Sequence, residues 1–525
     1  MKDKDPKYNL MLIFALVIVL AFDIFFVSHK EGYLTEEILS YELSNSEFTP
    51  IRLTEMLEEG PVWMSSSEIR EHVSFYGNDS FALFSAYRNS ASDICPPLYF
   101  MMLNGFCVLR AIFSYGTLSP WPGCILNIIF MMGSMLIIGS FFRNVIGQKY
   151  LGPVAALFYG LSPAGIDTVL LTRSYGAAAF FCLATAYLVI SRIAAGGSFK
   201  KGNKKIIFFT VLGFLTEYLT GVFFFFLILS SVIYLVSSKK KKEALYLIRT
   251  MMISAGVGAL LYPFVFGDIY TALTGPLLRE NFASGSLPGN LTGALEKIAD
   301  RTGWSEGGAV SMLVFVLLSA LVAMLTKRMK FYAPVLFASA CGYIVTVTAA
   351  VPSGENSCLI PVFPFVMIIW IMGLGFIIYY IAERFLTGSG LRKAIYTGVL
   401  FIWTVSCICL VLVITPEYLC EGYSDQLGIS RYYSSYDAVL IYGDEGFYRN
   451  VPELMNYGNC LLLKEEEAES FDERLASLNA VIVIEGEGVD KDAVIRTIGN
   501  MYGFHSMTYL AGDGVFGDRV CLLSK

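Results

Sequence analysis

The sequence predicts a polytopic α-helical membrane protein of about 11 to 13 transmembrane helices with a small C-terminal extracytoplasmic α/β domain. Of its 525 residues, 55% are hydrophobic and only 16% are charged, whereas soluble domains carry about 25% charged residues. Long apolar runs recur from residue 10 to residue 414, and residues 416–525 alternate short strands with helices. This composition excludes a plain soluble enzyme and a disordered chain.

Apolar runs of membrane-spanning length begin near the N-terminus. A bilayer core needs about 20 apolar residues per helix, and Leu10–Val27 is the first such run. It follows a basic start and lacks a small-x-small cleavage site, so we expect a retained anchor rather than a removed signal peptide. We expect Pro97–Tyr115 to form a re-entrant or interfacial helix. The other predicted membrane segments are Ile125–Phe142, Leu151–Leu161, Ala177–Ile190, Ile206–Leu215, Leu219–Val236, Met252–Phe266, Ser311–Leu325, Phe331–Val351, Leu359–Ile381 and Ile395–Ile414.

Clusters of lysine and arginine between these runs predict the orientation. They lie at residues 200–205, 239–242, 327–330 and 384–393. Cytoplasmic loops hold an excess of positive charge, so we expect these clusters and the N-terminus in the cytoplasm, in a plasma membrane protein. Two cytoplasmic clusters must be separated by an even number of crossings, which predicts that Ile206–Ser237 and Leu151–Ser191 each form a helical hairpin. Between apolar runs such clusters indicate topology and no nucleic-acid partner.

Two segments are too polar to cross a bilayer. His29–Asp93 contains 12 acidic and 4 basic residues, and Pro416–Lys525 contains 19 acidic and 8 basic residues. The overall charge of −6 therefore conceals charges of −8 and −11 in these segments and +13 in the remainder. We expect residues 1–415 to form the transmembrane domain, with outer loops at 29–95 and 267–308, and residues 416–525 to form an extracytoplasmic domain.

The C-terminal segment has the pattern of a small α/β domain. Its predicted strands are 438–442, 460–463, 480–484 and 520–523, and its predicted helices are 451–455, 466–478 and 490–501. A supporting or acceptor-binding role is the default for such a domain. The sequence leaves open a disulfide between Cys460 and Cys521, because spacing alone does not determine their distance.

Ionisable residues in or beside the apolar runs are functional candidates, since each costs about 2.5–3.5 kcal/mol at membrane depth on insertion scales. They are Asp23, Glu36, Glu37, Asp93, Arg173 and Glu217. All but Asp23 fall at the predicted outer surface, and this convergence predicts a site there. The alternative is that each residue merely anchors a helix end at the lipid headgroups.

A series of short motifs runs in order through residues 10–380. They are Thr35-Glu-Glu-Ile-Leu-Ser-Tyr-Glu-Leu-Ser-Asn-Ser46, Asp93-Ile-Cys-Pro-Pro-Leu-Tyr-Phe100, Leu161-Ser-Pro163, Thr172-Arg-Ser-Tyr175, Leu215-Thr-Glu-Tyr218, Tyr262-Pro263 and Ile360-Pro-Val-Phe-Pro364. The series resembles that of the GT-C membrane glycosyltransferases of the protein O-mannosyltransferase and aminoarabinose-transferase type. The resemblance implies that the transmembrane domain is GT-C-like.

The resemblance also implies a reaction. Such enzymes take a sugar from a polyprenyl-phosphate carrier and pass it to a hydroxyl or phosphate acceptor on the outer face, usually with inversion. A carboxylate receives the acceptor proton, and cations hold the departing phosphate. The implied partners are a polyprenyl-phosphate sugar donor, a glycan, lipid or protein acceptor, and membrane lipid. No cofactor is certain, and a divalent cation remains open.

Residue roles follow from the same resemblance. It implies catalytic roles for Glu36, Glu37 and Asp93, binding of the donor phosphate by Arg173 and Arg279, and substrate binding by Tyr99, Tyr175 and Glu217. Glu36 occupies the place of the family's first-loop aspartate, the expected base. Because neighbouring residues on a helix point apart, only one of Glu36 and Glu37 enters the site directly, and we expect it to be Glu36. Aromatic packing is the alternative for the two tyrosines.

Four positions depart from the family pattern. Glutamate replaces the expected aspartate at 36, Cys95 replaces a histidine, Glu217 replaces another, and the arginine before the late prolines is absent around Asn356-Ser357. Two other functions therefore stay open. One is a non-catalytic relative that binds lipid-linked sugars, and the other is a transporter or flippase for such lipids.

Overall fold

The computed structural model describes residues 5–48, 61–75, 83–93, 95–274, 287–304, 308–325, 330–350, 356–385, 416–443, 447–468, 470–486, 489–511 and 518–525, with a few positions between 398 and 411. The chain forms two compact units. The helical unit comprises Met1–Phe26, Ile94–Tyr99 and Ile125–Pro416, and the α/β unit comprises Val27–Asp93, Phe100–Cys124 and Glu417–Lys525.

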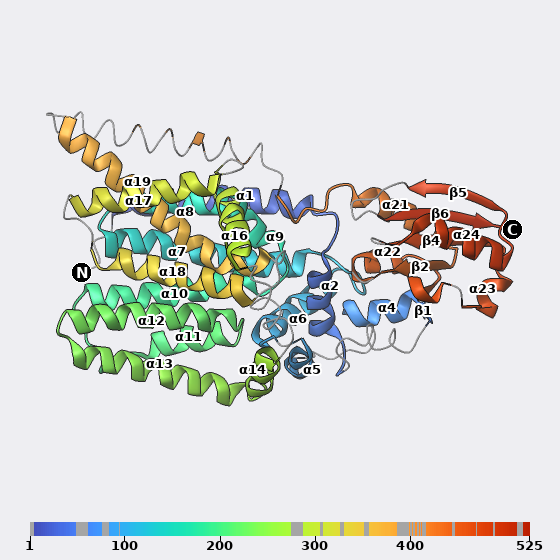
Figure 1. Ribbon diagram of the computed structural model, residues 1–525, viewed down its shortest axis with the longest axis horizontal. Helices are drawn as coiled ribbons and strands as arrows, with labels where there is room; N and C mark the ends of the chain where they lie inside the picture. Colours follow the sequence, from blue (N-terminus) through green and yellow to red (C-terminus); the bar gives the residue numbers. More distant parts are fainter. Residues whose placement is uncertain are drawn as a thin grey trace. The chain divides into compact units, whose positions relative to one another are not determined.

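The helical unit is built from long apolar helices that run side by side (Figure 1). In chain order they are α1 (Pro6–Ser28), α7 (Trp121–Phe141), the π-helical η2 (Phe142–Ile146), α8 (Leu151–Leu161), α9 (Pro163–Leu170), α10 (Tyr175–Ala194), α11 (Lys204–Phe214), α12 (Leu219–Ser237), α13 (Lys241–Leu261), α14 (Val265–Thr274), α16 (Leu287–Arg301), α17 (Gly308–Leu325), α18 (Tyr332–Ala350), η3 (Asn356–Val362) and α19 (Phe363–Phe385).

The fold class predicted from the sequence, a multi-pass membrane protein with a C-terminal α/β domain, is confirmed. Among the described residues, seven helices are long and apolar enough to cross a bilayer, or eight if the pair α8 and α9, bent by 58°, is one span. The larger number of crossings stays a prediction. Ile206–Leu215 and Ser311–Leu325 form the shorter helices α11 and α17, and Ile395–Ile414 lies mostly outside the described residues. Pro97–Tyr115 contains the 14-residue helix α6 (Leu98–Ala111), which is shorter than a full span.

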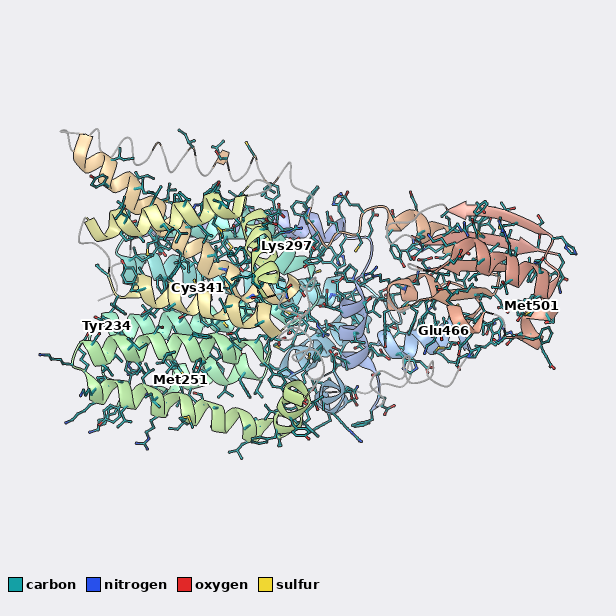
Figure 2. The ribbon with its side chains drawn as sticks, viewed as in Figure 1. Tyr234, Met251, Lys297, Cys341, Glu466 and Met501 are labelled. Carbon is teal, nitrogen blue, oxygen red and sulfur yellow. The ribbon has the colours of Figure 1, made fainter. Side chains whose placement is uncertain are left out.

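Turns lie where the two predicted hairpins require them, although the crossings themselves stay a prediction. α11 and α12 are joined by a turn at residues 215–218, and α8–α9 is joined to α10 by residues 171–174. α10 has 20 residues, so it is about 30 Å long. Its first turn and the lysines that follow its last turn therefore lie at opposite ends of the helical unit. Tyr234, near the end of α12, lies at the lysine end (Figure 2).

Small residues let helices of this unit approach closely. A Cβ atom at Gly160 in α8 would lie 2.6 Å from a methyl group of Val19 in α1, closer than packed atoms allow. A buried cluster that includes Val189, Phe199 and Leu247 joins α10, α11, α12 and α13, and Tyr234 and Met251 pack against it. Close packing of this kind is the main attraction between helices in lipid.

The α/β unit contains a six-stranded sheet. Its helices and strands are α2 (Thr35–Asn45), β1 (Val62–Ser65), α4 (Ser66–Val73), α5 (Leu83–Asn89), η1 (Ser90–Ser92), most of α6, α21 (Tyr423–Tyr432), β2 (Ala438–Tyr442), η4 (Tyr448–Asn450), α22 (Val451–Leu454), β3 (Asn459–Lys464), η5 (Glu465–Glu467), α23 (Glu473–Ser477), β4 (Ala480–Glu485), α24 (Lys491–Tyr502), β5 (Ser506–Ala511) and β6 (Arg519–Ser524).

The strand order is β1-β3-β2-β4-β6-β5. The central strands β3, β2 and β4 are parallel, whereas β1, β6 and β5 pair antiparallel with their neighbours. The four predicted strands are confirmed. Two strands were missed, namely β5 and β1. β1 comes from the predicted first outer loop and places Val62 opposite Leu462.

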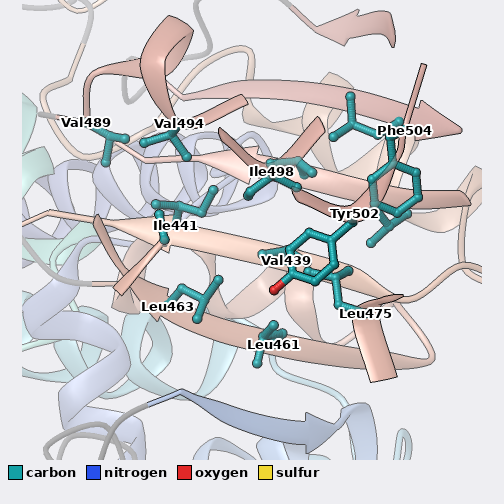
Figure 3. Close-up of a cluster of buried hydrophobic side chains, with 14 residues drawn as sticks. Val439, Ile441, Leu461, Leu463, Leu475, Val489, Val494, Ile498, Tyr502 and Phe504 are labelled. Carbon is teal, nitrogen blue, oxygen red and sulfur yellow. The ribbon is translucent and has the colours of Figure 1, made fainter. Parts of the chain in front are cut away.

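One face of this sheet forms a hydrophobic core with α24. Side chains alternate between the two faces of a strand, so Val439 and Ile441 of β2 point to the same face. Ile498 and Tyr502 of α24 cover that face (Figure 3). Cys460 and Cys521 are buried free thiols, and they belong to β3 and β6, which β2 and β4 separate.

A pair of buried carboxyl groups lies in the α/β unit. Glu453 and Asp518 are 0% and 2% exposed, and Asn450 donates from Nδ2 to Oε1 of Glu453 at 3.5 Å and to Oδ2 of Asp518 at 2.8 Å. Burial, and then the neighbouring Asp518, raise the pKa of Glu453 to about 8. Protonated Glu453 is therefore the form that the fold favours.

This pair predicts a stability that falls as pH rises. Glu453 keeps its proton in the folded state until the pH reaches its raised pKa of about 8, whereas in the unfolded chain it loses the proton near the ordinary glutamate pKa of 4.5. The contribution of Glu453 to the free energy of unfolding is therefore fully present below about pH 4.5. It decreases toward pH 8, by up to about 1.4 kcal/mol per pH unit. Denaturant unfolding of Glu453→Gln should show a flatter pH dependence across this window. The exposed Glu466→Gln is the control, and an unchanged slope in Glu453→Gln would contradict the assignment.

Candidate functional site

The predicted first-loop glutamates lie in the first turn of α2, in the α/β unit. Leu34 is the N-cap, and the Glu37 carboxylate accepts its backbone N–H at 2.9 Å from Oε2. This contact satisfies one of the amide groups that every helix start leaves unpaired. Successive residues are about 100° apart around a helix, so Glu36 and Glu37 point in different directions.

The Glu37 carboxylate is buried in an ion pair with a lysine. Its Oε2 lies 3.0 Å from Nζ of Lys30, and both side chains are 0% exposed. Lys30 also donates to the carbonyl oxygen of Tyr418 at 2.7 Å. Burial alone would lower the pKa of Lys30, but the Glu37 carboxylate reverses this and raises that pKa overall. Lys30 therefore stays charged and holds Glu37 in place, while Glu36 is only half-buried.

Asp93 lies in the same unit as Glu36, directly after η1. The side chain of Asn89 connects η1 to the end of α2, because its Nδ2 donates to the carbonyl oxygens of Ser46 at 2.8 Å and Leu43 at 3.4 Å. Asp93 is half-buried. The α/β unit therefore joins the segment before Asp93 to the C-terminal end of α2, whereas Glu36 lies in the first turn of that helix.

The remaining predicted residues lie in the helical unit, at the end opposite the lysine loops. Arg173 is 8% exposed and its Nη2 lies 3.8 Å from Sγ of Cys95. The adjacent Ser174 donates its hydroxyl to Oε2 of Glu217 at 2.5 Å. Three sequence motifs therefore meet here, namely those that contain Cys95, Arg173 with Tyr175, and Glu217. Cys358 of η3, just before the late proline motif, lies 3.4 Å from the Tyr175 hydroxyl.

Tyr99 is buried in the core of the helical unit. Its side chain is 0% exposed, and its hydroxyl lies 3.4 Å from Oδ1 of Asn127. This environment favours the packing alternative for Tyr99. Arg279, the second predicted phosphate ligand, lies outside the described residues.

Two further polar pairs of the helical unit were missed. Asp167 of α9 accepts a hydrogen bond from Nη1 of Arg301 in α16 at 2.8 Å, and the Tyr218 hydroxyl donates to the carboxylate of Asp268 in α14. Burial raises the pKa of Asp268, although the Tyr218 hydrogen bond opposes this. Asp167 lies in the mostly apolar helix α9, within the predicted hairpin Leu151–Ser191. Its charge there was a usable signal, because buried ionisable groups of membrane proteins are functional candidates.

Within the part of the chain that the structure describes, no three His, Cys, Asp or Glu side chains gather closely enough to hold a metal ion. The site is therefore described by its carboxylates, arginines and aromatic residues.

No protein-family model matches the chain, and no curated protein matches it. Several solved structures do match the chain. The crystal structure of ArnT from Cupriavidus metallidurans bound to undecaprenyl phosphate matches with a TM-score of 0.53 at 10% identity, over 98% of this chain and 97% of that one. The apo structure of the same ArnT gives a TM-score of 0.47 at 11% identity, over 98% and 97% of the two chains. The oligosaccharyltransferase of Archaeoglobus fulgidus gives 0.45 at 11% identity, over 97% of this chain and 72% of that one.

Proposed function

Because the chain has the fold of a GT-C membrane glycosyltransferase along nearly its whole length, we propose that it transfers a sugar from a polyprenyl-phosphate donor to an acceptor at the extracytoplasmic face. The match to ArnT, a protein whose structure holds undecaprenyl phosphate, is the observation that carries this proposal. The gathering of Arg173, Glu217 and Tyr175 at one end of the helical unit supports it.

The proposed reaction is a single displacement. The acceptor oxygen attacks the anomeric carbon, a new glycosidic bond forms, and the bond from that carbon to the phosphate oxygen breaks. Glu36 takes the acceptor proton, and the polyprenyl phosphate leaves as an anion beside Arg173. A base and a preorganised cation are the two contributions that such a transition state needs.

Glu37 has a different part in this proposal. Its carboxylate binds Lys30 and caps α2, so it positions the helix that carries Glu36. Asp93 is proposed to orient the acceptor, and Glu217 to hold the Arg173–Tyr175 segment through Ser174. Tyr175 is proposed to contact the sugar.

Turnover of defined donors tests the function directly. Purified protein in nanodiscs is incubated with undecaprenyl-phosphate-linked hexoses and pentoses and with an extract of envelope acceptors. Release of free undecaprenyl phosphate, measured by mass spectrometry, is the expected result for at least one donor. A protein that only binds lipid-linked sugars would release none, and a transporter would move the intact donor across vesicles.

Arg173→Gln should weaken the binding of undecaprenyl phosphate by about tenfold or more, because a hydrogen bond between charged groups contributes about 1.5–3 kcal/mol. The measurement is a titration of the full-length protein with undecaprenyl phosphate. Arg249→Gln, at an exposed position of α13, is the matched control, and Arg173→Lys should recover part of the affinity. Equal affinity of wild type and Arg173→Gln would remove Arg173 from the phosphate site.

A further inference from the structure

A cavity of about 480 Å³ lies within the α/β unit, apart from the carboxylate of Glu36. This volume is in the range of about 300–1,000 Å³ that is typical of small-molecule sites. Its walls come from the segment after α1, from α4, from the loop after α6, and from α21 and the end of α22. The residues that decide its chemistry are Lys30, Glu31, Tyr33, Arg70, Tyr115 and Arg431.

Two arginines line this cavity and make it electropositive. Arg70 is half-buried and donates from Nη2 to the carbonyl oxygen of Met455 at 2.6 Å, and Arg431 is exposed. Among the described residues, neither forms an ion pair. Other arginines of the same unit do, since Arg474 pairs with Asp437 at 2.9 Å and Arg519 with Glu485 at 2.5 Å.

Two carboxylates, one in the cavity wall and one paired with a lysine of that wall, are already engaged. Glu31 accepts the backbone N–H groups of Gly422 at 2.6 Å and Ser424 at 3.2 Å, and Glu37 is bound to Lys30. The cavity wall has three cationic side chains, Lys30, Arg70 and Arg431. Together with these two carboxylates they leave one unit of positive charge. That excess matches a carboxylate, whereas a phosphate monoester carries about −1.5 to −2 at neutral pH.

An aromatic ring completes the cavity. Tyr115 is 51% exposed and packs edge-to-face on Phe75 with ring centroids 6.4 Å apart, so its position is held from one side. An exposed aromatic ring offers a flat apolar surface with a polar tip. The C–H face of a sugar ring packs on such a surface, and guanidinium groups bind a carboxylate in a planar, two-point geometry.

We propose that this cavity binds a sugar residue that carries one carboxylate, such as a uronic acid. This ligand would be part of the acceptor, and that identification rests on the proposed glycosyl transfer. The binding of the acidic sugar itself is independent of the proposed function. The Lys30–Glu37 pair links the cavity wall to α2, the helix that also carries Glu36.

Binding of glucuronic acid to the full-length protein tests the proposal. Ligand-observed NMR titrations in phosphatidylcholine nanodiscs should show saturable binding of glucuronic acid and much weaker binding of glucose and glucose 6-phosphate. Arg431→Gln should weaken glucuronic acid binding by about tenfold or more, through loss of a charged hydrogen bond. Arg431 is exposed, so its replacement preserves the fold. Arg70→Gln should have a similar effect, and Arg496→Gln, at an exposed position of α24 outside the cavity, should have none.

Several results would overturn the proposal. Equal binding of glucose and glucuronic acid would remove the role of the charge, and tighter binding of glucose 6-phosphate would exclude the carboxylate. Competition by phosphatidylglycerol in the nanodisc would identify a lipid headgroup as the ligand instead. Loss of transfer in Glu36→Gln with intact glucuronic acid binding would leave both proposals standing. Transfer without glucuronic acid binding would reject only the cavity, and binding without transfer would reject only the glycosyltransferase.

Discussion

Replacement of Glu36 by glutamine should reduce the release of undecaprenyl phosphate from a sugar donor by about a hundredfold to ten-thousandfold, the usual contribution of a general base. Glutamine preserves the size and hydrogen-bonding shape of the side chain but does not accept the acceptor proton. Because Glu36 is half-buried in the first turn of α2, the variant should express and unfold like the wild type. Rates are compared at saturating donor.

The matched control for this variant is Glu71→Gln, which neutralises an exposed glutamate of α4 in the same unit. It should transfer at the wild-type rate. Glu36→Asp moves the carboxylate back by more than an ångström, and misplacement of this size costs up to about 100-fold, so its rate should be intermediate. Undiminished transfer by Glu36→Gln would show that another group is the base.

Replacement of Glu37 by glutamine should mainly lower the stability of the protein. The transfer rate of the protein that remains folded should fall less than in Glu36→Gln. The change leaves the ammonium group of Lys30, which is 0% exposed, without its counter-charge. Breaking one partner of a buried ion pair costs about 3–5 kcal/mol. Thermal unfolding of the full chain in nanodiscs measures this loss, with Glu36→Gln as the neighbouring control.

A double variant separates the ion pair from other effects at this position. Lys30→Met combined with Glu37→Gln removes both charges, and the glutamine carbonyl still accepts the backbone N–H of Leu34. This variant should recover most of the stability, because an apolar replacement of a buried pair is often neutral. A Glu37→Gln variant as stable as the wild type but inactive would assign the base to Glu37 instead of Glu36.

Membrane helices and central strands could be predicted from the sequence because their signal is local. Apolar length specifies α1 and α12, and alternation of apolar side chains specifies β2 and β4. β1 has no such signal. It is a four-residue segment of the first loop, and it becomes a strand because β3, almost 400 residues later, offers an edge for pairing. Long-range pairing leaves no local mark in a chain.

The sequence by itself determined that this is a multi-pass membrane protein with acidic segments outside its apolar runs, because hydrophobic length and charge act residue by residue. It also supplied the ordered motifs from which the fold was expected. Only the tertiary structure separated the adjacent glutamates of α2, since identical side chains differ only in what surrounds them. Lys30 binds Glu37 and the carbonyl oxygen of Tyr418 from a distant segment, and Glu37 also accepts the backbone N–H of the neighbouring Leu34. The cavity with Arg70 and Arg431 likewise exists only after segments far apart in sequence have packed together.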